Sequence, residues 1–131
     1  MQLTVDCRTG VHNENTEVAN AGADVVLSWL KKLDGKQHTL INLERLDGSH
    51  LTIGGGPSWY VVVFDDGKKN LTLQNLSGLE TEVLELCAGG QYGEYPKSFC
   101  VDQNQAEQVV KLFFEGNEAS VAWISEAPSG D

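Results

Sequence analysis

Residues 38–65 read HTLINLERLDGSHLTIGGGPSWYVVVFD, and this stretch decides the fold. Apolar and polar residues alternate in residues 38–46 and again in residues 50–55, and a period of two is typical of β-strands. The sequence DGS at residues 47–49 separates these runs and predicts a hairpin. Residues 58–65 are apolar at successive positions, which predicts a central strand covered on both faces. We therefore expect the middle of the chain to form the centre of a sheet.

The glycine run GGGP at residues 54–57 joins the last two of these strands. A phosphate-binding loop needs a helix directly after its glycines, and a P-loop also needs a Gly-Lys-Ser/Thr ending. Here a predicted strand follows, and the run contains no lysine. The run therefore predicts a glycine bulge or turn that bends one strand into the next.

Further strands are expected on either side of this stretch. They lie at residues 2–7, 70–76, 81–90 and 120–124. Residues 8–19 are polar and are predicted to form a loop. Residues 89–101 mix glycines, aromatics and one proline, so both a short strand and irregular structure fit them. Residues 125–131 are expected to form a frayed tail.

Two segments have apolar residues at helical spacing. The first runs from Gly22 to Leu33, and the second follows Asp102, a good N-cap, and ends at Gly116. The expected order of elements is β-α-β-β-β-β-(β)-β-α-β. Because most connections between strands are short, we expect a mainly antiparallel sheet of about six to eight strands. Two helices must cover this sheet, which makes residues 1–131 a single α+β domain.

The chain is acidic, with a net charge of −10, and its acids are unevenly distributed. Residues 1–63 contain 7 acids and 5 bases, whereas residues 64–131 contain 12 acids and 4 bases, which gives net charges of −2 and −8. A field of this sign repels nucleic acids and anionic membranes and attracts a basic protein. The alternative is that the acids only keep the protein in solution.

The expected location is the cytoplasm. No apolar run approaches the roughly 20 residues that span a bilayer, and the N-terminus lacks the pattern of a secretory signal. The three cysteines, Cys7, Cys87 and Cys100, are an odd number without close spacing, so they do not indicate a disulfide framework. We expect reduced thiols, and no C-x-x-C indicates a zinc site.

No convincing catalytic set is found in the sequence, so we do not expect an enzyme, and we expect no cofactor or metal. The three histidines do not form an H-E-x-x-H pattern. Cys87 or Cys100 with a histidine would give a small Cys-dependent hydrolase, which is the alternative function. Both cysteines lie in the acidic half of the chain, and an acidic setting opposes the thiolate that such catalysis needs.

The acidic half also contains aromatic residues in a glycine-flanked loop, and tyrosine is favoured at protein interfaces. A docking face for a basic partner is therefore predicted there. Its candidate residues are Asp65, Asp66, Glu80, Glu82, Glu85, Tyr92, Glu94 and Tyr95.

Four segments, in their order and spacing, carry a resemblance. They are I-G-G-G-x-x-W-Y-V at residues 53–61, G-G-Q-Y-G-E-Y-P at 89–96, A-E-Q-V-V-K-L-F-F-E-G at 106–116 and V-A-W at 121–123. Together they resemble the first-numbered family of immunity proteins from bacterial polymorphic toxin systems. The resemblance covers roughly residues 21–124.

The resemblance implies a cytoplasmic antitoxin that is made beside its toxin and neutralises it by direct binding. The implied partners are toxin domains that attack nucleic acids, including deaminases that convert cytosine in DNA. Members of the family vary in their first twenty residues, so residues 1–20 inherit no role, and no catalytic residue is carried over. A third possibility is an acidic adaptor that binds a partner other than a toxin.

Overall fold

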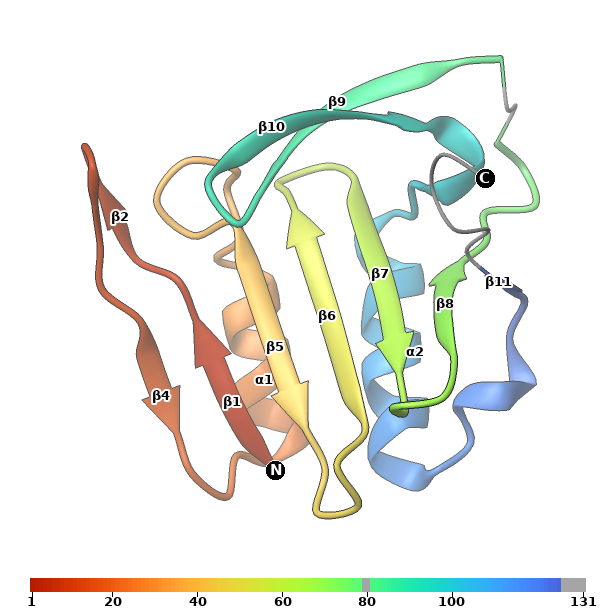
Figure 1. Ribbon diagram of the computed structural model, residues 1–131, viewed down its shortest axis with the longest axis horizontal. Helices are drawn as coiled ribbons and strands as arrows, with labels where there is room; N and C mark the ends of the chain where they lie inside the picture. Colours follow the sequence, from red (N-terminus) through yellow and green to blue (C-terminus); the bar gives the residue numbers. More distant parts are fainter. Residues whose placement is uncertain (79–80, 126–131) are drawn as a thin grey trace.

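The structure is a computed structural model, and it describes residues 1–78 and 81–125 (Figure 1). Its main sheet contains seven strands in the order β11-β8-β7-β6-β5-β1-β4, and all neighbouring strands are antiparallel. These strands are β1 (Gln2–Val5), β4 (Thr16–Val18), β5 (Leu40–Glu44), β6 (His50–Gly55), β7 (Tyr60–Asp65), β8 (Asn70–Leu73) and β11 (Trp123–Ser125).

Two small hairpins and two helices complete the described fold. The hairpins pair β2 (Arg8–Thr9) with β3 (His12–Asn13), and β9 (Val83–Ala88) with β10 (Gln91–Pro96). The helices are α1 (Ala23–Leu30) and α2 (Gln103–Glu115), and the short 3-10 turns are η1 (Lys97–Phe99) and η2 (Glu118–Ser120). The predicted α+β class, with a mainly antiparallel sheet and two covering helices, is confirmed. No helix in the described part of the chain combines the length and the apolar character that crossing a membrane requires.

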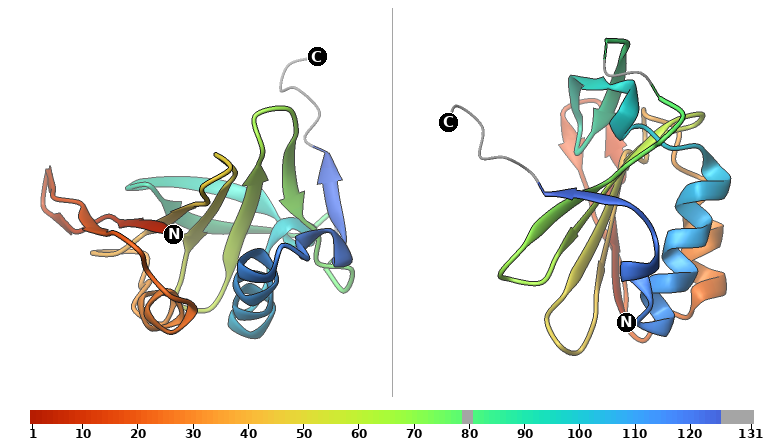
Figure 2. Two further views of the ribbon diagram at one scale, coloured as in Figure 1. Left: turned by 90° about the horizontal axis from the view of Figure 1, so that it is seen from below. Right: turned by 90° about the vertical axis from the view of Figure 1, so that its right-hand side faces the viewer.

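Both helices pack on the same face of the main sheet (Figure 2). Tyr60, Val62 and Phe64 of β7 are buried on that face, whereas Val61 and Val63 on the opposite face are only half-buried. We call this opposite side the open face. The expectation that β7 would be covered on both faces is therefore wrong, because its valines on the open face have no helical layer above them.

The second helix shows how the sequence sets its own boundaries. The Asp102 side chain accepts a hydrogen bond from the Gln105 backbone N–H, and the Gln105 side chain accepts one from the Asp102 N–H, which is a capping box. Gly116 ends the helix at a φ of 76°, in the left-handed region that favours glycine. Phe113 then packs edge-on against Phe64, with 6.1 Å between ring centroids. This contact ties α2 to the centre of the sheet.

One segment differs from the sequence prediction, and a second had been left open between two alternatives. Residues 8–19 were expected to form a loop, but they contain β2, β3 and β4, which are short and mostly exposed. Such edge strands have no apolar alternation, since neither of their faces is fully buried. Residues 89–101, for which both a strand and irregular structure fitted, contain strand β10 and the turn η1.

Candidate functional site

The β9–β10 hairpin is separate from the main sheet. It lies across the ends of the central strands, beyond the end of β6 (Figure 1). Gly89 and Gly90 form its turn, with φ values of 64° and 79°, and Ala88 pairs with Gln91 across it. A two-residue turn with positive φ at both positions matches the right-handed twist of paired strands, and glycine adopts it without strain. This turn fixes the register of every pair in the hairpin.

The inner face of the hairpin packs on β6. A Cβ atom placed on Gly54 would lie 2.6 Å from the Cβ atom of Ala88, so only glycine at this position allows the hairpin to lie so close. Leu86, on the same face as Ala88, is buried. The glycine run that was predicted to bend one strand into the next therefore also provides the contact for this second layer.

The outer face of the hairpin carries the feature that we regard as the candidate site. Glu85 and Glu94 are directly opposite each other across the two strands, and neither carboxylate has an ion-pair partner among the described residues. Tyr92 and Val83 lie on the same face, with 69% and 55% of their surface exposed. Like charges directly opposite each other destabilise an antiparallel pair. We call Glu85 and Glu94 the acidic pair.

A buried carboxylate anchors the hairpin turn to the first strand. Asp6, at the end of β1, accepts hydrogen bonds from the backbone N–H groups of Thr39 (2.6 Å) and Leu40 (3.0 Å) and from Arg8 Nε (2.7 Å). The Thr39 hydroxyl also donates to Asp6, and it accepts a hydrogen bond of 2.9 Å from the Gly90 N–H. The turn is thereby joined to β1 and β5 through a single hydroxyl.

The environment of Asp6 acts on its pKa in two opposing ways. Burial raises the pKa of this carboxyl, but the hydrogen bonds from Thr39, Arg8 and Leu40 outweigh burial and hold the pKa below its usual range. Asp6 is therefore an anion at neutral pH, with its hydrogen bonds made inside the protein. Unlike the carboxylates of the acidic pair, the Asp6 carboxylate is buried and already hydrogen-bonded, so it is not available to a partner.

The predicted docking residues are divided between different parts of the structure. Glu85, Glu94 and Tyr92 come together on the outer face of the hairpin. Glu82 lies at the foot of the hairpin, where it forms an ion pair of 3.2 Å with Lys97. Tyr95 is half-buried on the inner face, with its ring against Gly93.

The remaining predicted residues lie elsewhere. Asp65 ends β7 on the open face, at the end of that strand far from the hairpin, and Asp66 follows it in the β7–β8 turn. The Asp66 carboxylate accepts hydrogen bonds from the backbone N–H groups of Lys68 and Lys69. Glu80 lies outside the described residues. The described docking residues therefore do not form one contiguous face.

The thiols are in settings that oppose nucleophilic chemistry. Burial raises the pKa of Cys100 to about 11, and its Sγ donates a hydrogen bond to the Pro96 carbonyl. Burial also raises the pKa of Cys87. No hydrogen bond links either thiol to a histidine in the described part of the chain, and no group of three or more potential metal ligands is found there. The geometry that a Cys-dependent hydrolase requires is thus missing from these residues.

Sequence reasoning missed Val83 and Asp6 as parts of the site. Gly89-Gly90 between two alternating runs was the available signal for a two-residue hairpin, and its register would have placed Glu85 opposite Glu94. No comparable signal marks Asp6, because its partners Thr39 and Leu40 are more than thirty residues away in the chain. Neither protein-family models nor curated protein sequences give a match for this chain.

Proposed function

We propose that this protein is a cytoplasmic immunity protein that binds and neutralises a bacterial toxin which attacks nucleic acids, such as a cytosine deaminase. The observation that carries the proposal is the acidic pair, unpaired and placed beside exposed Tyr92 and Val83. The sequence resemblance supplies the class of partner. The outer face of the hairpin occupies the toxin's basic groove and blocks access of the nucleic acid.

Electrostatics favours a basic partner at this face. Repulsion between Glu85 and Glu94 destabilises the hairpin of the unbound protein. A lysine or arginine placed between the two carboxylates would remove this repulsion. Enzymes that process nucleic acids have basic grooves for the phosphate backbone. The net charge of −10 would also speed encounter with such a groove, by about 10- to 1,000-fold in favourable cases.

The exposed side chains supply the rest of a protein-binding surface. Tyr92 is large and has few rotatable bonds, so it buries much area for a small loss of conformational entropy. Val83 adds apolar surface on the same face. An aromatic and apolar centre beside charged groups is the common composition of protein interfaces.

The test is co-purification of the tagged protein with the toxin domain encoded beside its gene, followed by an assay of that toxin's activity. We expect a stable complex and loss of toxin activity. The double variant Glu85→Lys/Glu94→Lys keeps two like charges opposite each other, so its stability is expected to stay close to that of the wild type. Its affinity should fall by at least about 100-fold, with a weaker dependence on salt.

The matched control is Glu14→Lys/Glu17→Lys, which makes the same change in net charge at exposed positions outside the hairpin. This control should lose much less affinity than the hairpin variant. An equal loss in both variants would show that net charge alone drives binding. Binding without inhibition of the toxin would contradict the immunity role and favour the adaptor.

A further inference from the structure

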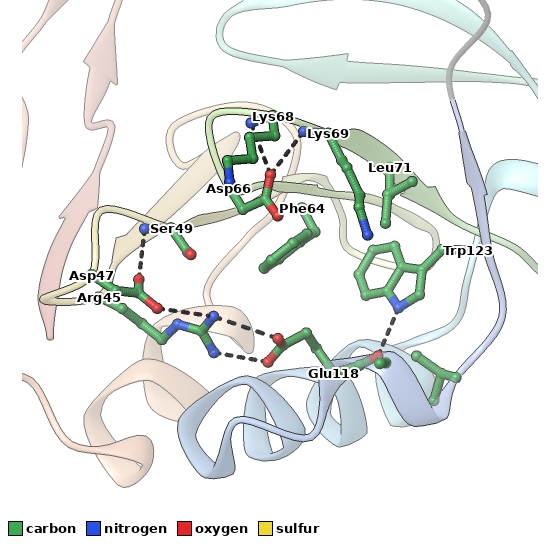
Figure 3. A pocket seen from close by; sticks show the side chains of 12 residues that line it. Arg45, Asp47, Ser49, Phe64, Asp66, Lys68, Lys69, Leu71, Glu118 and Trp123 are labelled. Atoms are coloured by element: carbon green, nitrogen blue, oxygen red, sulfur yellow. Dashed lines mark hydrogen bonds and ion pairs between the residues drawn. The ribbon is translucent and has the colours of Figure 1, made fainter.

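A cavity of about 640 Å³ lies on the helix-covered side of the sheet, at the end of β7 opposite the hairpin (Figure 3). Its apolar wall is formed by Phe64, Leu71, Val121 and Trp123. The Phe64 and Trp123 rings are 6.0 Å apart between centroids, with an interplanar angle of 52°. The β7–β8 turn and η2 form its rim. The volume lies within the range of about 300–1,000 Å³ that is typical of small-molecule sites.

The arginine on this rim already has partners within the protein. Arg45 Nη1 donates to Glu118 Oε1 at 2.8 Å and to the Phe113 carbonyl at 3.1 Å, and Nη2 donates to Glu118 Oε2 at 3.4 Å. The guanidinium also lies over the Phe113 ring, 4.3 Å from its centroid. Arg45 and Glu118 thus neutralise each other and close one wall of the cavity.

The other two carboxylates on the rim are engaged as well. Asp47 accepts a hydrogen bond of 2.8 Å from the Ser49 N–H and lies 3.5 Å from Arg45 Nη2. Asp66 accepts hydrogen bonds from the backbone N–H groups of Lys68 and Lys69, at 2.9 Å and 2.7 Å. These contacts fix the Asp47 carboxylate in the β5–β6 turn and the Asp66 carboxylate in the β7–β8 turn.

The ammonium groups of Lys68 and Lys69 are the cations of the rim that form no ion pair. Neither forms an ion pair or a side-chain hydrogen bond with any residue that the structure describes. Backbone hydrogen bonds from Lys69 and Lys68 lower the pKa of Asp66, and the Lys69 charge lowers it further. Figure 3 shows the Lys69 side chain extending from the turn toward Trp123. We call Lys68 and Lys69 the lysine pair. Two adjacent ammonium groups that form no ion pair with a described residue lie beside an aromatic cavity, where they can meet the charge of an anion.

We propose that this cavity binds a small organic anion with a flat apolar body, in the class of aromatic carboxylates. The two aromatic rings suit an aromatic body, which they contact by stacking or edge-on packing. The lysine pair faces the carboxylate at the mouth of the cavity, where the ligand's charge keeps contact with water. This site is independent of the proposed toxin-binding face, because the cavity and the hairpin lie at opposite ends of β7.

The probe for the experiment is 2-naphthoate, titrated into the ¹⁵N-labelled protein and followed by backbone amide chemical shifts. We expect the shifts to change at residues 66–71 and 118–123. The double variant Lys68→Gln/Lys69→Gln should weaken binding by about tenfold, because it removes both cations. Lys111→Gln, which removes an exposed lysine of α2 outside the cavity, should leave the affinity unchanged. The neutral analogue 2-naphthamide should bind wild-type protein about as weakly as 2-naphthoate binds the double variant.

Three outcomes would overturn the proposal. One is equal affinity of 2-naphthoate for the wild type and for the Lys68→Gln/Lys69→Gln variant. Another is equal affinity of the wild type for 2-naphthamide and 2-naphthoate, which would remove the role of charge. The third is an absence of shift changes around the cavity at millimolar probe. Toxin binding is measured separately on the same lysine variant, which should inhibit the toxin like the wild type, so failure at one site does not imply failure at the other.

Discussion

The two ends of β7 have similar designs with opposite signs of charge. At the hairpin turn, buried Asp6 has its hydrogen bonds made internally, and further along the hairpin the acidic pair is exposed and forms no ion pair with a described residue. At the cavity, Arg45 is held by Glu118, and the lysine pair beside it forms no ion pair with a described residue. In both places one charged group stabilises the fold while two others remain available. The acidic pair lies on an exposed ribbon, where we propose that a protein binds, whereas the lysine pair borders a cavity, where we propose that a small molecule binds.

The comparison shows that a charge is available to a ligand only where it is not already engaged with groups of the protein, which a count of charges does not reveal. Residues 64–131 have a net charge of −8, yet this half of the chain supplies both the acidic pair and the lysine pair. An asymmetry along the sequence is therefore not an asymmetry in space. Asp66 and Glu82 are both exposed, but each already has a partner. Asp66 accepts a hydrogen bond from the Lys69 N–H within its own turn, and Glu82 forms an ion pair with Lys97 at the foot of the hairpin.

The largest expected effect comes from removing the anchor at the hairpin end. Asp6→Ala leaves the N–H groups of Thr39 and Leu40 and the Arg8 guanidinium without their acceptor. We expect the free energy of unfolding to fall by about 3 kcal/mol, as measured by urea denaturation. Glu14→Ala, at an exposed position, should change it by less than about 0.5 kcal/mol. A loss below about 1 kcal/mol for Asp6→Ala would show that the anchor is dispensable.

The anchor at the cavity end should contribute less. Glu118→Gln keeps the shape of the side chain and removes its charge, while Arg45 retains the Phe113 carbonyl and its contact with the Phe113 ring. The Arg45 and Glu118 side chains are 17% and 16% exposed, so water compensates for part of the lost pairing. We expect a loss of about 1–2 kcal/mol in the same denaturation experiment. A loss as large as that of Asp6→Ala would remove the difference between the two ends.

The pH dependence of stability should report on the Asp6 anchor. The pKa of Asp6 is lowered from 3.8 in the folded protein, so its contribution is fully present above pH 3.8 and is lost as the pH falls through the folded value. We expect the free energy of unfolding to decrease from pH 5 to pH 2, with a shallower decrease in Asp6→Asn. The effect should be smaller than that of Asp6→Ala, because protonation keeps the side chain in place. Identical pH profiles for the two proteins would contradict the assignment.

The smallest effect has the opposite sign. Glu94→Lys replaces a repulsive cross-strand pair with an attractive one opposite Glu85, so it should stabilise the protein by about 0.5–1 kcal/mol. The matched change Glu14→Lys, at an exposed position outside the helices and strands, has no cross-strand partner and should give a smaller gain. Thermal unfolding at low ionic strength measures the difference. A destabilised Glu94→Lys protein would show that the acidic pair is not repulsive in the folded state.

Much of the fold was predictable because short-range patterns decide it. Alternation located β5, β6 and β8, and the Asp102 cap with Gly116 located the ends of α2. The placement of both helices on one face was not predictable, since Val61 and Val63 are as apolar as their covered neighbours. An apolar pattern identifies residues that prefer burial, but it does not identify which layer buries them.

The candidate site was predictable only in part. Glu85, Tyr92 and Glu94 were among the expected docking residues, and the structure brings them to one face. Their separation from Asp65 and Asp66 depends on the hairpin leaving the main sheet, which results from contacts between distant segments such as Gly54 with Ala88. The lysine pair was visible in the sequence as a doublet, but the cavity beside it also needs Val121 and Trp123, which lie about fifty residues further along the chain.

The attachment of the hairpin through one face has a consequence for how such a protein can change over generations. Gly54, Ala88 and Gly90 hold the hairpin to the sheet, whereas the side chains at positions 83, 85, 92 and 94 are exposed and lie on the face opposite Leu86 and Ala88. Selection on these outward positions can therefore alter specificity with little effect on folding. A lineage that meets a new partner could adapt by a few substitutions on one ribbon, while the rest of the chain stays under constraint from the core.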